Sequence, residues 1–376
     1  MRIAFHVPRA SHLTPGPSGD KVLVHNLLVS LRGRGHEVKV VSYVNVRDFW
    51  RGRVPARRLV SEALSIRREM RRFSPDAWLV YDARVTNPDL FGWWQRPKRY
   101  VLINTGAGTG RNLPRRWRWL FTFAHRRSLA RADRIAAARP PHADQLRSLG
   151  VTEDRLRLLP VAAETWDWMP SQQEARRRLR LPQEATIILC VTRLPALQGD
   201  GKHPGKTEAV LELLAAMTEL PTESLLLLVG DGPGRSQVEC DITGLKLEGR
   251  VRLAGSVPHD DVRWFYAACD FYAFPDPGDR AFAAIVEAQA AGRPVAAMQT
   301  RSDQLVIDEG RTGLLAKDLQ EFRVHIAILA RDRARCESMG QSAREYIVQS
   351  HSLDSRVRQI EAMLVGEEML HPSHIR

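Results

Sequence analysis

Residues 276–295, DPGDRAFAAIVEAQAAGRPV, carry the clearest fold signal in the chain. A short apolar run ends at Phe274, a loop with proline and glycine follows, and a helix is predicted from Ala281 to Gly292 before the next apolar run. This order is typical of a parallel sheet, and it directs the free N–H groups at the helix start toward a ligand at the strand end. Asp279 and Glu287 are about two helical turns apart, so they share one face of this helix.

The same alternation of apolar runs and amphipathic segments extends along the whole chain. With 376 residues, 44% hydrophobic and 26% charged, the chain is long enough for two domains, and six strands are predicted in each half. The predicted strands are 2–7, 37–43, 77–81, 100–104, 134–137 and 156–160, then 186–192, 224–230, 251–254, 271–274, 294–298 and 313–316. We expect an α/β fold of two facing, doubly wound, Rossmann-like domains, residues 1–168 and 169–350, with a cleft between them. Residues 351–376 are expected to form a helix that packs back on the first domain.

Positive charge is concentrated in the first half. The chain carries 56 Lys and Arg against 43 Asp and Glu, a net charge of +13, to which residues 1–168 contribute +17 and residues 169–376 contribute −4. No apolar run approaches the roughly 20 residues of a membrane-spanning helix, and the first residues do not read as a secretory signal. The four cysteines are too widely spaced for a C-x-x-C zinc motif or a dense disulfide framework. These features favour a cytoplasmic protein whose first half meets an acidic partner.

Residues 276–295 resemble the retaining glycosyltransferases of family 4, which have the GT-B fold and two glutamates separated by seven residues. Glu287 matches the second glutamate, and residues 288–295 match the Ala-x-Ala-x-Gly-x-Pro-Val run that follows it. The resemblance implies that Glu287 holds the ribose hydroxyls of a nucleotide and that Asp279 contacts the transferred sugar. It also places the helix start at the donor, through Ala281, Phe282 and Ala283. Two positions depart from the family pattern, because Asp279 replaces a glutamate and Phe282 replaces a small glycine. The alternative is that the two carboxylates are merely solvated.

Two cations follow the strand predicted at 186–192. The family has an arginine after this strand and a lysine before the next helix, and the resemblance implies that Arg193 and Lys206 clamp the diphosphate, with Lys202 as the alternative lysine. The glycines of the insert between them miss the register of a phosphate-binding Walker loop by one residue, so an ATPase is not predicted.

Further landmarks of the family cover nearly the whole chain, loosely in the first half. Gly232 lies in a Gly-Asp-Gly-Pro turn, and Ser256 and Val257 follow a strand whose end contacts the base in the family. The resemblance also places Gly19 near the donor phosphate or sugar, and Asn104 where many relatives carry a histidine close to the reacting sugar.

Arginine and aromatic residues occur together in two segments of the basic half. Residues 56–73 carry an apolar stripe flanked by arginines, and residues 111–131 repeat the pattern with Trp117, Trp119 and Phe123. Such helices suit an anionic membrane surface, although the stripe of 56–73 fits equally well packed on the sheet. The second segment is less easily explained as core. A nucleic-acid groove is the competing interpretation, but no binding motif accompanies it.

The predicted function is that of a retaining glycosyltransferase that takes a UDP- or GDP-sugar as donor and requires no metal or other cofactor. Its predicted acceptor is a lipid-linked or phosphorylated glycan, as in lipopolysaccharide core or other bacterial envelope synthesis. Its predicted state is a monomer, peripheral at the inner face of the cytoplasmic membrane, with no nucleic acid bound. The alternative is a basic GT-B-like protein that binds membrane or nucleic acid without transferase activity.

Overall fold

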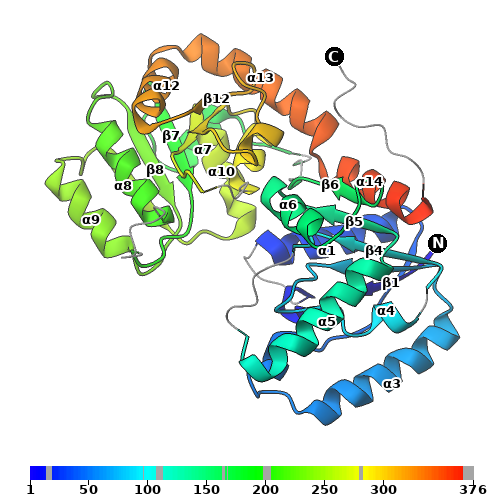
Figure 1. The fold of residues 1–376 in the computed structure, drawn as a ribbon. Helices are drawn as coiled ribbons and strands as arrows, with labels where there is room; N and C mark the ends of the chain where they lie inside the picture. Colours follow the sequence, from blue (N-terminus) through cyan, green and yellow to red (C-terminus); the bar gives the residue numbers. More distant parts are fainter. Residues whose placement is uncertain are drawn as a thin grey trace. The chain divides into compact units, whose positions relative to one another are not determined.

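The computed structural model describes residues 1–13, 19–95, 97–106, 113–162, 166, 168–197, 205–278 and 283–366. By internal contacts the chain divides into two compact units, Met1–Pro160 with Leu353–Arg376, and Val161–Ser352 (Figure 1). The sequence places this boundary after Trp168 and the second one after residue 350, whereas the contacts divide the chain at Pro160 and Ser352.

Unit 1 is built on a parallel sheet with strand order β2-β1-β3-β4-β5-β6. Its four central strands are buried on both faces and are apolar almost throughout, whereas the edge strands β2 and β6 carry exposed or half-buried charged residues. The strands are β1 Arg2–His6, β2 Glu37–Val40, β3 Ala77–Tyr81, β4 Arg99–Ile103, β5 Arg134–Ala137 and β6 Leu156–Leu158. The helical segments are η1 Ala10–Leu13, α1 Gly19–Gly33, α2 Val46–Trp50, α3 Ala56–Phe73, α4 Gly92–Gln95, α5 Arg115–Arg131, α6 Pro140–Ser148 and α14 Leu353–Val365.

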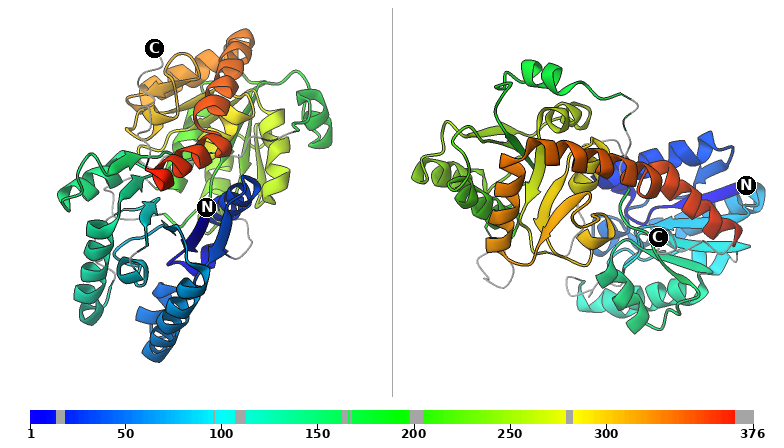
Figure 2. Two further views of the ribbon diagram at one scale, coloured as in Figure 1. Left: turned by 90° about the vertical axis from the view of Figure 1, so that its right-hand side faces the viewer. Right: turned by 90° about the horizontal axis from the view of Figure 1, so that it is seen from above.

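Helix α14 comes from the far end of the described chain and covers one face of this sheet. Its Val357 and Ile360 lie in one apolar cluster with Leu27 of α1 and with Ile3 and Phe5 of β1. In both views of Figure 2 the red α14 lies beside the blue N-terminal elements of this unit.

The apolar stripe of α3 covers the other face of the sheet. Ile66, Met70 and Phe73 are buried in a cluster with Trp78 and Leu102. The stripe was interpreted either as a membrane-binding face or as a face packed on the sheet, and in the structure it packs on the sheet. No described helix is both long enough and apolar enough to pass through a bilayer.

Unit 2 repeats the plan, with strand order β12-β11-β10-β7-β8-β9 and parallel pairing throughout. Its strands are β7 Ile187–Val191, β8 Leu225–Val229, β9 Val251–Gly255, β10 Phe271–Phe274, β11 Val295–Met298 and β12 Gly313–Ala316. Its helical segments are α7 Gln172–Arg178, α8 Lys206–Met217, α9 Arg235–Gly244, α10 His259–Ala268, α11 Ala283–Ala290, η2 Asp303–Leu305, α12 Leu319–Arg331 and α13 Arg333–Ser350. Every one of the predicted strands is present within the described residues, and the predicted doubly wound α/β architecture is confirmed.

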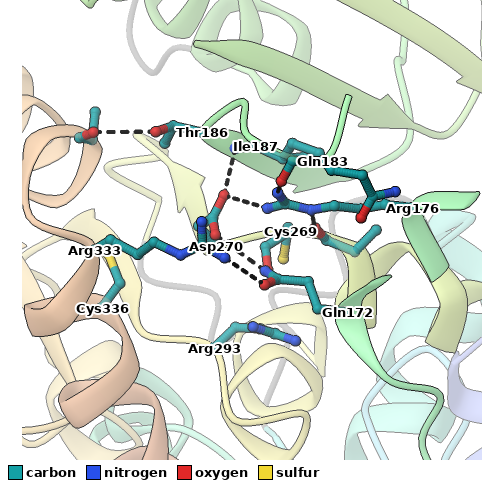
Figure 3. Close-up of polar contacts among 12 residues, drawn as sticks. Gln172, Arg176, Gln183, Thr186, Ile187, Cys269, Asp270, Arg293, Arg333 and Cys336 are labelled. Atoms are coloured by element: carbon teal, nitrogen blue, oxygen red, sulfur yellow. Dashed lines mark hydrogen bonds and ion pairs between the residues drawn. The ribbon is translucent and has the colours of Figure 1, made fainter. Parts of the chain in front are cut away.

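A buried ion pair joins α7 to the amino ends of β7 and β10 (Figure 3). The Arg176 side chain is 1% exposed, and its Nη2 donates to Asp270 Oδ2 at 2.8 Å while its Nε donates to the Ala268 carbonyl at 3.0 Å. Asp270 Oδ2 also accepts from the Ile187 N–H at 2.6 Å, and Oδ1 accepts from Gln172 Nε2 at 3.1 Å. This network lies at the amino ends of the strands, so it does not occupy the carboxyl edge of the sheet.

Candidate functional site

The loops after β7 and β8 lie against each other at the carboxyl edge of the unit 2 sheet. The Leu194 N–H donates to the Asp231 carbonyl at 3.1 Å, and the Gly234 N–H donates to the Leu194 carbonyl at 2.9 Å. A Cβ at Gly232 would lie 2.1 Å from the Leu194 oxygen, and Gly232 has φ +154°. Glycine is therefore required here for the two backbones to approach so closely. This gives Gly232 a definite local task in setting the position of the loop after β7.

Arg193 is the cation on that loop. Its neighbours are fixed on both sides, because the Thr192 N–H donates to the Val229 carbonyl at 2.9 Å and Leu194 bonds as above. The Arg193 side chain is exposed, and it forms no ion pair or side-chain hydrogen bond with any residue in the described parts of the chain. A guanidinium on a fixed backbone with its donors open is suited to bind an anion.

Lys206 is the first residue of α8 and is half-buried, with Gly205 as the helix N-cap. The next residue anchors the helix to the Arg193 loop, since Thr207 Oγ1 donates to the Pro195 carbonyl at 2.6 Å. The Lys206 charge also reaches the end of β7: burial raises the pKa of the Cys190 thiol, and the nearby Lys206 ammonium opposes that rise. The two predicted cations therefore both lie at the carboxyl end of β7. The alternative, Lys202, lies outside the described residues.

Glu287 lies on α11 and is half-buried. The hydroxyl of Tyr266 on α10 donates to Glu287 Oε2 at 2.8 Å. Burial, and next the Glu287 carboxylate, raise the pKa of Tyr266, so the phenol keeps its proton and remains a donor. Tyr266 is therefore a positioning residue for Glu287, and one that the sequence analysis missed. The only signal available from the sequence was a hydroxyl at a core position of a helix.

The loop after β10 begins with a buried carboxylate. Asp276 Oδ1 accepts from the Gly278 N–H at 2.7 Å, and this hydrogen bond forms a local turn at the start of the loop. Ala283 is the first residue of α11. The other residues predicted on this loop, Asp279, Ala281 and Phe282, lie outside the described part of the chain.

Ser256 and Val257 follow β9 directly. Ser256 is exposed, and Val257 packs on the unit 2 core. The end of β9 is joined to the end of β8, because the Gly230 N–H donates to the Gly255 carbonyl at 2.8 Å. These residues therefore lie at the same edge of the sheet as Gly232.

The two residues predicted from the first half belong to unit 1. Gly19 is the first residue of α1. Asn104 follows β4 with φ +55°, a left-handed conformation that asparagine tolerates better than most side chains, and the next N–H, of Thr105, donates to the Ala136 carbonyl at 3.0 Å. Both lie at the carboxyl edge of their own sheet.

Two six-stranded parallel sheets, each covered by helices on both faces, with a C-terminal helix returned to the first unit, define the GT-B class of fold. Three solved structures with this fold cover 97% of the chain. Sucrose-phosphate synthase from Thermosynechococcus elongatus matches with a TM-score of 0.70 at 17% identity, with 98% of that chain covered. HepE from Anabaena, solved with UDP, matches with a TM-score of 0.72 at 17% identity and 100% coverage. WaaG, a glycosyltransferase involved in lipopolysaccharide biosynthesis, matches with a TM-score of 0.64 at 15% identity and 100% coverage.

Sequence comparison shows similarity to glycosyltransferases. Residues 198–332 match the family described as Glycosyl transferases group 1, and the predicted resemblance to glycosyltransferases is confirmed. The D-inositol 3-phosphate glycosyltransferase 1 of Catenulispora acidiphila is 28% identical over 227 residues, which are 58% of this chain and 54% of that protein. The lipopolysaccharide core biosynthesis glycosyltransferase LpsE of Rhizobium meliloti is 28% identical over 182 residues, 48% of this chain and 50% of that protein. The chain thus spans about half the length of these curated relatives.

Proposed function

We propose that the protein is a retaining glycosyltransferase that moves a sugar from a nucleotide-sugar donor, UDP- or GDP-linked, to a glycan acceptor. The observation that carries the proposal is the pair of cations Arg193 and Lys206 at the carboxyl end of β7, one of them with its donors open on a fixed loop. Anionic ligands of doubly wound sheets bind at this edge, where helix N-termini and cations can share the charge.

The proposed mechanism is electrostatic. The Arg193 guanidinium and the Lys206 ammonium neutralise the charge that develops on the departing nucleoside diphosphate, and the helix dipole at the start of α8 adds to this stabilisation. Glu287, oriented by the Tyr266 hydroxyl, accepts hydrogen bonds from the ribose. Asp279 orients the sugar. Since the chain's own cations supply the positive charge, the proposed reaction uses no metal.

In this proposal unit 1 binds the acceptor, a lipid-linked or phosphorylated glycan of the lipopolysaccharide core or another bacterial envelope polymer. Two curated relatives support an acceptor of this class by their names, because one acts in lipopolysaccharide core biosynthesis and another, from Mycobacterium tuberculosis, is a phosphatidylinositol monomannoside mannosyltransferase, 25% identical over 78% of this chain. Gly19 and Asn104, at the carboxyl edge of the unit 1 sheet, are the proposed contacts to the reacting sugar.

Helix α5 supports a peripheral site of action at the inner face of the cytoplasmic membrane. Trp119 is 69% exposed and Phe123 is 50% exposed, and both stand among exposed arginines, whereas Phe121 is buried on the inner side of the helix. Exposed aromatic rings with arginines suit the headgroup region, where each arginine contributes on the order of 1 kcal/mol. Replacing Arg115, Arg116 and Arg118 by glutamate should release the protein from anionic vesicles while the donor still binds. Unchanged vesicle binding in this variant would contradict the proposed membrane contact. So would a parent protein that binds an oligonucleotide and a variant that loses it, because the basic surface would then bind nucleic acid.

The central experiment is a thermal-shift screen against UDP-, GDP-, ADP- and CMP-sugars, followed by a transfer assay with the sugar that stabilises. Glu287→Ala and Lys206→Ala should each abolish transfer and the ligand-induced shift while the melting temperature without ligand stays within a few degrees. Glu239→Ala, an exposed glutamate that pairs with Arg235 on α9, is the matched control and should keep full activity. Full activity in either site variant would refute the proposed site.

A further inference from the structure

Three segments that follow adjacent strands each carry an arginine at the carboxyl edge of the unit 1 sheet. Arg9 follows β1, Arg47 lies on α2 after β2, and Arg84 follows β3. The strands β2, β1 and β3 are neighbours in parallel register, with Ile3 paired to both Val38 and Ala77. The three segments therefore emerge side by side at one edge.

Helix α2 is held between the other two segments. The Val46 N–H donates to the Pro8 carbonyl at 3.0 Å, immediately before Arg9, and Trp50 Nε1 donates to the Thr86 carbonyl at 3.0 Å, two residues after Arg84. Phe49 packs in an apolar cluster with Val85 of the third segment. Arg47 is thus fixed in position between Arg9 and Arg84.

The third segment is itself well ordered. Asp82 is buried with φ +60°, and the Arg84 Nε donates to Asp82 Oδ1 at 2.6 Å. Arg84 and Asn87 form an antiparallel bridge, and the Asn87 side-chain amide donates to the Asp82 carbonyl. Local hydrogen bonds therefore fix the start of this arginine side chain.

Positive charge exceeds negative charge in the cluster. The groups whose charges act on Arg47 are three further arginines, Arg9, Arg51 and Arg84, and one carboxylate, Asp82. Burial, and then Arg9, lower the pKa of Arg47, while Asp82 opposes that change. The acid that follows Arg47 in the sequence, Asp48, is paired with Arg53 at 3.6 Å.

Arg47 also has an open donor. Its Nε is buried and has no hydrogen-bond partner among the residues that the structure describes. An arginine side chain stays protonated in proteins, so this group cannot relieve the repulsion by losing its proton. Arginines withdrawn from water beside one another cost stability unless an anion joins them.

We propose that Arg9, Arg47 and Arg84 form a binding site for a phosphate group at the carboxyl edge of the unit 1 sheet. Phosphate oxygens match the planar fork of N–H donors that each guanidinium offers, and a dianion offsets the excess charge around the single carboxylate Asp82. The inference rests on the proposed function in one respect, since it assigns this phosphate to the acceptor rather than to the donor. The phosphate can come from a soluble sugar phosphate or from a phospholipid.

The test separates this site from the donor site. Titration calorimetry of the full chain with inorganic phosphate and with glucose 1-phosphate is carried out in the Arg193→Ala, Lys206→Ala background, so that the proposed donor cations do not contribute. Adding Arg47→Gln should weaken phosphate binding about tenfold or more, because it removes charged hydrogen bonds. Arg53→Gln, on an exposed arginine of the same segment, should change binding less than twofold. Loss of donor binding in the earlier screen would leave this measurement intact, so the two proposals fail separately.

Vesicles containing phosphatidic acid identify the source of the phosphate when Arg115, Arg116 and Arg118 are also replaced by glutamate, so that α5 does not contribute to vesicle binding. If Arg47→Gln loses glucose 1-phosphate but keeps the vesicles, the site takes a soluble phosphorylated glycan; if it loses both, the site takes a lipid phosphate as well. Unchanged binding of both probes, or an equal loss in Arg53→Gln, would overturn the proposal. Without any anion, Arg47→Gln should melt no lower than the parent, because repulsion is relieved. If it does unfold, Arg84→Gln gives the same binding comparison.

Discussion

Replacing Arg176 by methionine tests how unit 2 is held together at the edge away from the site. Methionine fills a similar volume, but it removes the donors to Asp270, Ala268 and Gln183. Within the described residues, the Asp270 carboxylate then stays buried with two donors left, the Ile187 N–H at 2.6 Å and Gln172 Nε2 at 3.1 Å. Breaking one partner out of a buried ion pair costs about 3–5 kcal/mol. In a unit of this size each kcal/mol lowers the melting temperature by about 2–4 °C, so we expect a drop of about 6–20 °C.

The assay is thermal unfolding at pH 7, monitored by calorimetry, and two further variants serve as comparisons. Arg178→Met, two residues further along α7, removes an exposed arginine that stacks over Trp264 at 4.3 Å and lies 3.9 Å from Asp261, so it should cost no more than about 1 kcal/mol. The double variant Arg176→Met, Asp270→Leu removes both charges and should recover part of the loss. A melting temperature for Arg176→Met within 2 °C of the wild type, or a double variant no better than the single one, would refute this account of the ion pair.

Three further predictions concern the site and the core. In steady-state kinetics, Tyr266→Phe should raise the KM for the donor severalfold and leave kcat nearly unchanged, because only the orientation of Glu287 is lost. The control is Tyr272→Phe, which should alter neither constant. Tyr272 is also buried, and its hydroxyl donates to the Val191 carbonyl at 3.4 Å. Gly232→Ala should weaken donor binding in thermal-shift titrations, since the new Cβ would force the Leu194 carbonyl and the Arg193 loop to move; Gly310→Ala, at φ +75° with open space around it, should leave donor affinity unchanged. Burial lowers the pKa of His125 to about 4 from 6.5, so the neutral imidazole stabilises unit 1 fully above pH 6.5 and this contribution, about 3 kcal/mol, is lost as the pH falls toward 4. Chemical denaturation should show a flatter dependence on pH between 7 and 4 in His125→Leu, and an unaltered slope would contradict the assignment.

Most strands were predictable because they are apolar runs that end at a loop residue, as Leu225–Val229 does at Gly230. The short helix α2 was not predicted: five residues carry too little periodicity, and its position depends on hydrogen bonds to Pro8 and Thr86. The local sequence pattern also cannot reveal a contact between two side chains that tertiary packing brings together.

Tyr266 is such a case, since its contact with Glu287 depends on how α10 lies against α11. The aromatic run of α5 divides in the structure in a way that its composition alone did not settle. Trp117 packs against Phe49 with ring centroids 4.8 Å apart and Phe121 is buried, while Trp119 and Phe123 remain exposed. The second segment is therefore partly core and partly surface, and only the surface part can take part in the proposed membrane contact.

The return of α14 to unit 1 has a consequence for how the protein is made. During synthesis on the ribosome, unit 2 emerges as one continuous piece and can fold as soon as Ser352 has left the exit tunnel. Unit 1 emerges first but lacks Val357 and Ile360, so the face of its sheet around Ile3 and Phe5 is covered only in part, by α1, until α14 arrives. The half of the chain translated first is therefore the half completed last, and throughout that interval its apolar face is available to chaperones or to aggregation.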